Sequence, residues 1–102
     1  MYEQRIVYAI EMDSFAEAQS ACVQYAQAVE VVPNRDGSFM ANGVIIDWSC
    51  ETGWSDKAEI EFVGGVNDVE RIFTDFKYHT GIEKTPEVGT WFTAEKMEYG
   101  ML

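Results

Sequence analysis

A strand-like alternation of hydrophobic residues occurs twice in this chain, and each time a helix-like stretch follows it. In Arg5–Met12, every second residue from Ile6 onward is hydrophobic. In residues 57–63, small or large hydrophobic residues again alternate with charged ones. Successive side chains of a β-strand point to opposite faces of a sheet, so each stretch predicts a strand with one buried face.

The first helix-like stretch begins at a capping box. Ser14 is positioned to cap the helix, and Glu17, three residues later, is positioned to reach back to it. The spacing of hydrophobic residues predicts a helix that runs to about Val29. Its expected apolar stripe comprises Phe15, Ala18, Cys22, Tyr25 and Val29.

The second helix-like stretch follows the Gly-Gly pair at 64–65. Asn67, with Glu70 three residues later, predicts its start, and Gly81 can supply a left-handed cap at its end. Lys77 and His79 suit the negative C-terminal end of this helix. Its expected apolar stripe comprises Val69, Ile72, Phe73 and Phe76.

Four further strands are expected outside these two units. Residues 30–32 resemble a short strand that Pro33 ends. Residues 38–40 and 44–49 are expected to pair as a hairpin, because the Asn-Gly pair at 42–43 is a strong hairpin signal. Residues 90–95 predict the last strand, after a loop over 82–89.

Together these elements predict a single α+β domain over residues 1–102. Their order favours a ferredoxin-like βαββαβ sandwich, in which an antiparallel sheet carries both helices on one face. In this order the elements are strand, helix, strand, strand, helix and strand. The alternative is an α+β domain with a longer β-meander through residues 30–63. A chain of 102 residues is long enough for one such core and too short for two.

Charge limits the classes of partner. The formal net charge is −11, from 18 acidic and 7 basic residues. Proteins that bind nucleic acid directly gain much of their affinity from Lys and Arg, and anionic membranes also attract basic proteins, so both are disfavoured here. The acidity favours a partner protein with a basic surface, or it simply keeps a small protein soluble.

Catalysis and cofactor binding have little support in the sequence. The two cysteines lack zinc-site spacing, and we expect no metal or other cofactor. Acidic neighbours would raise the pKa of Cys50 and oppose its use as a nucleophile. The one histidine, His79, suits a helix end better than an active site. Because no common catalytic motif is present either, we expect that the protein is not an enzyme. Without a signal peptide or a long apolar segment, we expect it to be cytoplasmic.

The stretch from Asp47 to Val63 combines tryptophans with carboxylates. The alternation places Trp48 in the core, whereas Trp54 follows a glycine in a polar loop and resembles an exposed interface anchor. Trp91 is a second possible anchor, or a residue that covers the core. The predicted partner-binding residues are Asp47, Glu51, Trp54, Asp56, Glu59 and Glu61.

Two functions fit these features. The first is a non-catalytic protein that occupies the basic surface of a nucleic-acid-handling partner, as a nucleic-acid mimic. In size, acidity and lack of catalytic motifs, the chain resembles in general type the small phage-encoded inhibitors of host machinery, including anti-CRISPR and other anti-defence proteins. The alternative is a ferredoxin-like small-molecule binding or sensory module, with a pocket lined by Tyr8, Tyr25, Trp48 and Phe92. The oligomeric state stays open, although acids on the sheet face oppose a dimer through that face.

Overall fold

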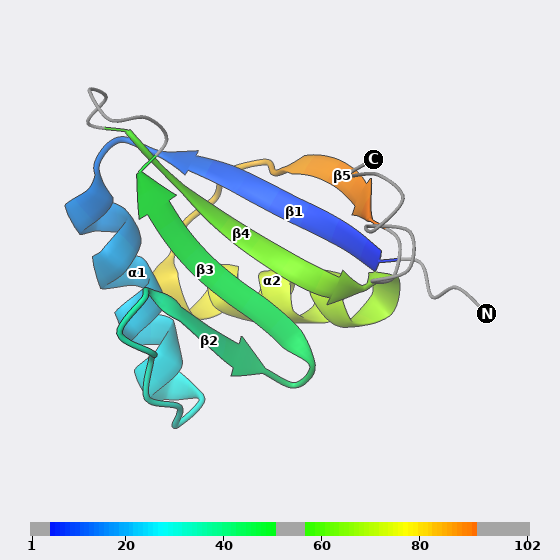
Figure 1. Ribbon diagram of the computed structural model, residues 1–102, viewed down its shortest axis with the longest axis horizontal. Coiled ribbons are helices and arrows are strands. Elements are labelled where there is room, and N and C mark those ends of the chain that lie inside the picture. The colour runs from blue at the N-terminus through cyan, green and yellow to red at the C-terminus, as the bar shows by residue number, and fades with distance from the viewer. Residues whose placement is uncertain (1–4, 51–56, 92–102) are drawn as a thin grey trace.

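The computed structural model describes residues 5–50 and 57–91. They form five strands and two helices in the order β1, α1, β2, β3, β4, α2 and β5 (Figure 1). The bounds of these elements are Arg5–Met12 for β1, Phe15–Ala28 for α1, Ser38–Ala41 for β2, Val44–Cys50 for β3, Ala58–Gly65 for β4, Val66–Thr80 for α2 and Glu87–Trp91 for β5.

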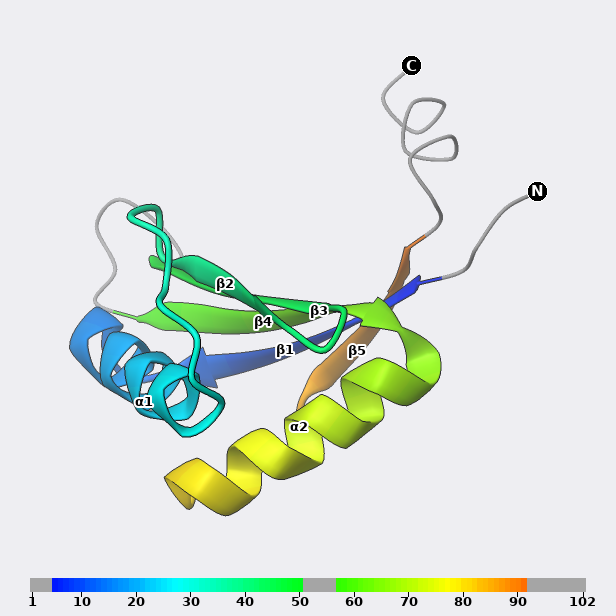
Figure 2. The same cartoon turned by 90° about the horizontal axis from the view of Figure 1, so that it is seen from below.

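The five strands form one antiparallel sheet with the order β2-β3-β4-β1-β5. Both helices pack on the same face of this sheet, and the described elements leave the opposite face open (Figure 2). The predicted α+β class, with an antiparallel sheet and two helices on one face, is therefore confirmed. The exact ferredoxin-like order is not confirmed, because the sheet has a fifth strand, β2, at one edge.

Two predicted features of the region between the helices have different outcomes. The hairpin is present, with Ala41 paired to Val44 across Asn42 and Gly43, whose φ angles are 48° and 84°. Strands β2, β3 and β4 are consecutive neighbours, so they form a meander that begins at Ser38 and not at residue 30.

The prediction of a strand at residues 30–32 is wrong. The chain instead turns back on the end of α1, where Val31 N–H donates to Ala26 O at 2.9 Å. Glu30 adopts a φ of 60°, which is a left-handed conformation and not that of a strand. The Val31 N–H is therefore hydrogen-bonded to the end of the helix and does not pair with a neighbouring strand.

The helices follow the predicted stripes with two corrections. Ser14 caps α1 by accepting a hydrogen bond from the Glu17 N–H at 3.1 Å, as the capping box predicts. Phe15, however, is 39% exposed and is not part of the core. Helix α2 begins at Val66 with Gly65 as its cap, so the predicted start near Asn67 is late, because strand β4 runs directly into the helix.

Strand β5 begins earlier than the sequence predicts. It spans Glu87–Trp91, so three of its residues lie in what was expected to be a loop, and residues 92–95 of the predicted strand lie outside the described part. Its pairing with β1, with Val88 opposite Tyr8 and Glu87 opposite Ala9, sets this start. Strand β1 is distant from β5 in sequence, which explains why the local sequence pattern did not reveal where β5 begins.

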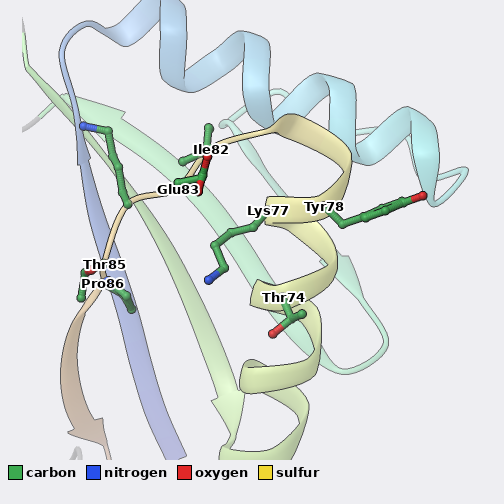
Figure 3. A pocket seen from close by; sticks show the side chains of 8 residues that line it. Thr74, Lys77, Tyr78, Ile82, Glu83, Thr85 and Pro86 are labelled. Carbon is green, nitrogen blue, oxygen red and sulfur yellow. The ribbon is translucent and has the colours of Figure 1, made fainter.

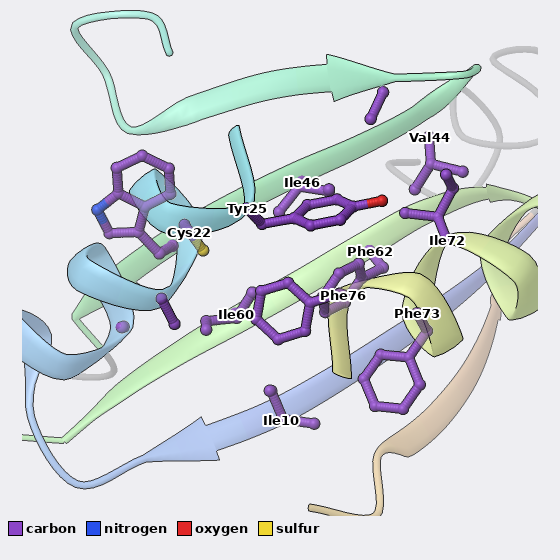
Figure 4. Close-up of a cluster of buried hydrophobic side chains, with 14 of the residues drawn as sticks. Ile10, Cys22, Tyr25, Val44, Ile46, Ile60, Phe62, Ile72, Phe73 and Phe76 are labelled. Carbon is purple, nitrogen blue, oxygen red and sulfur yellow. The ribbon is translucent and has the colours of Figure 1, made fainter. Parts of the chain in front are cut away.

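Aromatic rings fill the space between the sheet and the helices (Figure 4). Phe62 of β4 has no exposed surface, and its ring lies edge-on to Phe73 at 5.1 Å and to Phe76 at 5.0 Å. Tyr25 of α1 lies edge-on to Phe76 at 5.6 Å, and its hydroxyl donates to Asp75 Oδ2 at 2.7 Å. These contacts join both helices to the centre of the sheet.

Trp48 belongs to this core, as its position in the strand alternation predicts. It is 5% exposed and packs edge-on against Phe39 at 6.4 Å. Gly37, at a φ of 86°, brings its backbone against the indole, and a Cβ there would lie 3.4 Å from the ring. In the described part of the chain the Trp48 indole N–H has no hydrogen-bond partner, and such a group reduces stability by about 1–3 kcal/mol.

Candidate functional site

Strand register brings the carboxylates of two neighbouring strands together on the open face of the sheet. Asp47 of β3 pairs with Glu61 of β4, and Ser49 pairs with Glu59. The alternating residues of β4, Ala58, Ile60 and Phe62, have no exposed surface and face the helices. The acidic residues between them must therefore point to the other face.

The environment of these carboxylates disfavours their charged form. Partial burial, with the nearby charge of Asp36, raises the pKa of the Asp47 carboxyl above its ordinary value. Partial burial is also the main cause of a raised pKa at Glu61. The charges of Asp47 and Glu59 and a hydrogen bond with Glu59 raise it further. We name Asp36, Asp47, Glu59 and Glu61 the acidic cluster.

Asp36 joins this cluster through the turn that precedes β2. Its Oδ1 accepts a hydrogen bond from the Ser38 hydroxyl at 2.7 Å, and the Asn34 N–H donates to Ser38 O at 2.7 Å. Ser38 in turn lies opposite Asp47 in the sheet. Sequence reasoning missed Asp36, because its proximity to Asp47 depends on the addition of β2 to the edge of the sheet.

Ion pairs within the described residues do not include the acidic cluster. Lys57 Nζ lies 3.2 Å from Glu11 Oε1, and both side chains of this ion pair are about half exposed. The cluster is therefore a concentration of like charge on a protein surface, and a basic surface of another molecule would complement it.

The six residues predicted to bind a partner divide into two groups. The structure brings Asp47, Glu59 and Glu61 together on the open face. Glu51, Trp54 and Asp56 lie outside the described residues. The role of all six in binding stays a prediction, and so does that of Trp91, whose side chain is likewise not described.

Other groups with potential chemistry are occupied in packing. Burial, with a contribution from the charge of Asp47, raises the pKa of the Cys22 thiol to about 12, so this thiol is protonated at neutral pH. His79 Nε2 lies 3.5 Å from Asp75 Oδ1 in the last turns of α2.

Within the described ranges, no group of three or more His, Cys, Asp or Glu side chains is arranged to hold a metal ion. Neither described helix is long and apolar enough to cross a membrane.

A groove lies between α2 and the segment that leads to β5 (Figure 3). Its volume is 540 Å³, and a neighbouring hollow of 370 Å³ shares Thr74, Lys77, Thr85 and Pro86 with it and adds Tyr8 and Phe73. The Lys77 ammonium lies 5.1 Å above the Phe73 ring. This groove is on the helical side of the sheet, away from the acidic cluster.

The pocket predicted from the sequence is arranged differently. Tyr25 and Trp48 are buried among core rings, whereas Tyr8 lines the shallow hollow beside α2. Phe92 lies outside the described residues. The four residues therefore do not share one cavity in the part of the chain that the structure describes.

Comparisons of the chain with protein-family models, with curated proteins and with solved structures found no match.

The raised pKa values of Asp47 and Glu61 predict a dependence of stability on pH. In the unfolded chain both carboxyls titrate near their ordinary values of about 4. Because their pKa values are higher in the folded state, the folded protein keeps these protons to a higher pH. Their contribution to the free energy of unfolding is therefore unfavourable at pH 7 and becomes more favourable as the pH falls through the folded pKa values.

We expect Asp47→Asn and Glu61→Gln each to increase the free energy of unfolding at pH 7 by roughly 0.2–1 kcal/mol, the size of a cross-strand pair interaction. The gain should shrink as the pH approaches about 4, where the wild-type carboxyls are themselves protonated. Urea denaturation at several pH values measures both effects, with the exposed Glu83→Gln as a control. A loss of stability at pH 7 in both cluster variants would contradict this account.

Proposed function

We propose that this protein is a small acidic binding protein without catalytic activity, and that it occupies a basic surface of a partner protein through the acidic cluster. The proposed partner is a protein that handles nucleic acid, and the proposed role is inhibition of the kind exerted by small phage-encoded anti-defence proteins. We also infer a ferredoxin-like core. Without β2, the remaining order β3-β4-β1-β5 places the first and third strands of a βαββαβ unit at the centre.

One observation carries this proposal: Asp47, Glu59 and Glu61 crowd together on the open sheet face, and no ion pair within residues 5–50 and 57–91 involves them. Such crowding lowers the stability of the folded protein, as the raised pKa values of Asp47 and Glu61 indicate. Unfavourable like-charge arrangements are concentrated at functional sites, where a ligand supplies the missing charge. A basic partner would supply the positive charge that this surface lacks.

The sign and density of the charge favour a nucleic-acid-binding surface as the target. Such surfaces carry Lys and Arg that neutralise closely spaced phosphates. Glu59 and Glu61 lie two residues apart on one strand, which separates their positions by about 7 Å. Asp47 extends the negative charge to the next strand. The acidic cluster thus offers several negative charges to a surface that otherwise binds phosphates.

A capture experiment tests the proposal. The immobilised protein should retain a partner from cell lysate at low salt, and the Glu59→Gln/Glu61→Gln variant should retain much less of it. Double-stranded DNA should displace the captured partner, because both compete for the same basic surface. Glu70→Gln/Glu83→Gln removes the same charge from the helical side and should behave as wild type. Capture that neither the cluster variant nor DNA reduces would overturn the proposal.

A second candidate function, small-molecule binding, has separate support in the groove beside α2. Tyr8 and Phe73 line the smaller of its two neighbouring hollows, and Lys77 lines both. Their volumes, 540 and 370 Å³, are in the range of ligand sites, although both are open to solvent. The capture experiment separates the two functions, because a ligand held in this groove would not depend on the acidic cluster.

A further inference from the structure

An apolar row crosses the open sheet face beside the acidic cluster. The register pairs Met40 of β2 with Ile45 of β3, Ile45 with Val63 of β4, and Val63 with Val7 of β1. Paired residues on neighbouring strands lie on the same face of a sheet, so these four side chains form one continuous row. The four strands that carry it follow one another from β2, at one edge of the sheet, to β1 (Figure 1).

Exposure decreases steadily along this row. Met40 is 57% exposed and Ile45 is 37% exposed, whereas Val63 is half-buried and Val7 is 6% exposed. Single exposed hydrophobic residues are common on protein surfaces. Two large ones in direct cross-strand contact, continued by a third, form a contiguous patch, and such patches mark interaction sites. We name Met40, Ile45 and Val63 the apolar patch.

The apolar patch and the acidic cluster have a fixed spacing. Asp47 follows Ile45 by two residues on β3, and Glu61 precedes Val63 by two residues on the antiparallel β4. Two residues of a strand span about 7 Å, so the apolar and acidic rows run side by side at that distance. Any molecule that covers this part of the face must meet both rows.

We propose that the partner contacts this face with a basic amphipathic segment, whose apolar side chains cover Met40 and Ile45 and whose Lys or Arg side chains pair with Asp47 and Glu61. This inference rests on the proposed function and adds the apolar anchor and its orientation relative to the cations. Charge complementarity selects this occupant. A second copy of the chain would place acidic cluster near acidic cluster, and nucleic acid or an anionic membrane would add negative charge.

The two rows contribute differently to binding. Salt screens the attraction between the acidic cluster and the cations of the partner, and this attraction mainly sets the association rate and the orientation. Burial of the apolar patch is insensitive to such screening, because it depends on the removal of apolar surface from water. Binding should therefore retain a component at high salt that the apolar patch supplies.

Two synthetic helix-forming peptides test the inference. Both carry the same number of lysines along one side, and they differ in the adjoining side, which has leucines in one peptide and serines in the other. The wild-type protein should bind the leucine peptide about tenfold more tightly, since burial of one large apolar side chain is enough for such a difference. The preference should persist at about 0.5 M salt, where the Debye length is only a few ångströms.

Matched variants locate the contact. Met40→Thr/Ile45→Thr keeps residues that suit strands and should abolish the preference for the leucine peptide. Val32→Thr/Val88→Thr changes two other exposed valines, at 88% and 61% exposure, and should keep it. Met40→Thr alone gives the same test at the most exposed position if the double variant folds poorly. An equal preference for leucine in the wild type and in the Met40→Thr variants would overturn the inference.

The same titrations separate this inference from the proposed function. If Glu59→Gln/Glu61→Gln weakens both peptides but the wild type shows no preference for leucine, the acidic cluster binds cations and the apolar anchor is wrong. If neither peptide responds to that variant, the proposed function fails as well. Isothermal titration calorimetry of the full chain measures all of these affinities.

Discussion

Replacement of both Glu59 and Glu61 with lysine is expected to reduce the affinity for the protein partner by about a hundredfold or more at low salt. The change removes two attractive charges and places two cations against a basic surface. Like charges brought together at an interface cost several kcal/mol, and each 1.4 kcal/mol is about tenfold in affinity. Surface plasmon resonance with the captured partner measures the loss.

This loss should not result from unfolding. The side chains of Glu59 and Glu61 are partly exposed on the open face, and Glu61 lies opposite Asp47, so a lysine there meets an acid and relieves like-charge repulsion. The matched control is Glu70→Lys/Glu83→Lys, which changes the net charge equally on the helical side. An equal loss in both variants would mean that net charge, and not the acidic cluster, governs binding.

Phe62→Ala is expected to have the largest effect on stability, a decrease of about 3–5 kcal/mol in the free energy of unfolding. The side chain has no exposed surface, and its edge-on contacts with Phe73 and Phe76 hold α2 against the sheet. A cavity at this position removes contacts from several rings at once. Because small domains are stable by only about 5–15 kcal/mol, this loss is a large fraction of the total free energy of unfolding.

Urea denaturation followed by circular dichroism measures this effect. Val88→Ala, at a position that is 61% exposed, should change the free energy of unfolding by less than about 0.5 kcal/mol. A cost below about 1 kcal/mol at Phe62 would contradict the packing described for the core, because it would mean that the surrounding rings collapse into the space.

Local periodicity explains which elements the sequence could predict. Strand β1 has the predicted bounds Arg5–Met12, because its alternation is strong and its ends are marked. The capping box locates the start of α1, and Gly81, at a φ of 75°, ends α2 as expected. The hairpin at Asn42 and Gly43 follows from the conformations that these two residues accept readily.

Long-range pairing explains what the sequence could not predict. Strand β5 depends on β1, which lies at the opposite end of the described chain. Residues 30–32 have strand-like composition, but hydrogen bonds to the end of α1 hold them in another conformation. The start of α2 depends on the direct passage from β4 into the helix, which removed the loop in which a side-chain cap at Asn67 would have acted.

The candidate site shows the same division. Alternation along one strand was enough to place Glu59 and Glu61 on a common outward face, and alternation along the next did the same for Asp47. Cross-strand register was needed to find that Met40 lies directly opposite Ile45. The pairing of Met40 with Ile45 places apolar side chains beside the acidic residues, so the surface is both acidic and apolar.

The most direct test of the central claim is the salt dependence of the dissociation constant for the captured partner. Between about 0.05 and 0.5 M salt, we predict that the wild-type affinity falls at least tenfold, because screening weakens the attraction of the acidic cluster for a basic surface. The Glu59→Gln/Glu61→Gln variant should show weaker binding and a shallower slope. An affinity that stays constant across this range, with the same slope in the variant, would contradict the claim that the acidic cluster binds a basic partner.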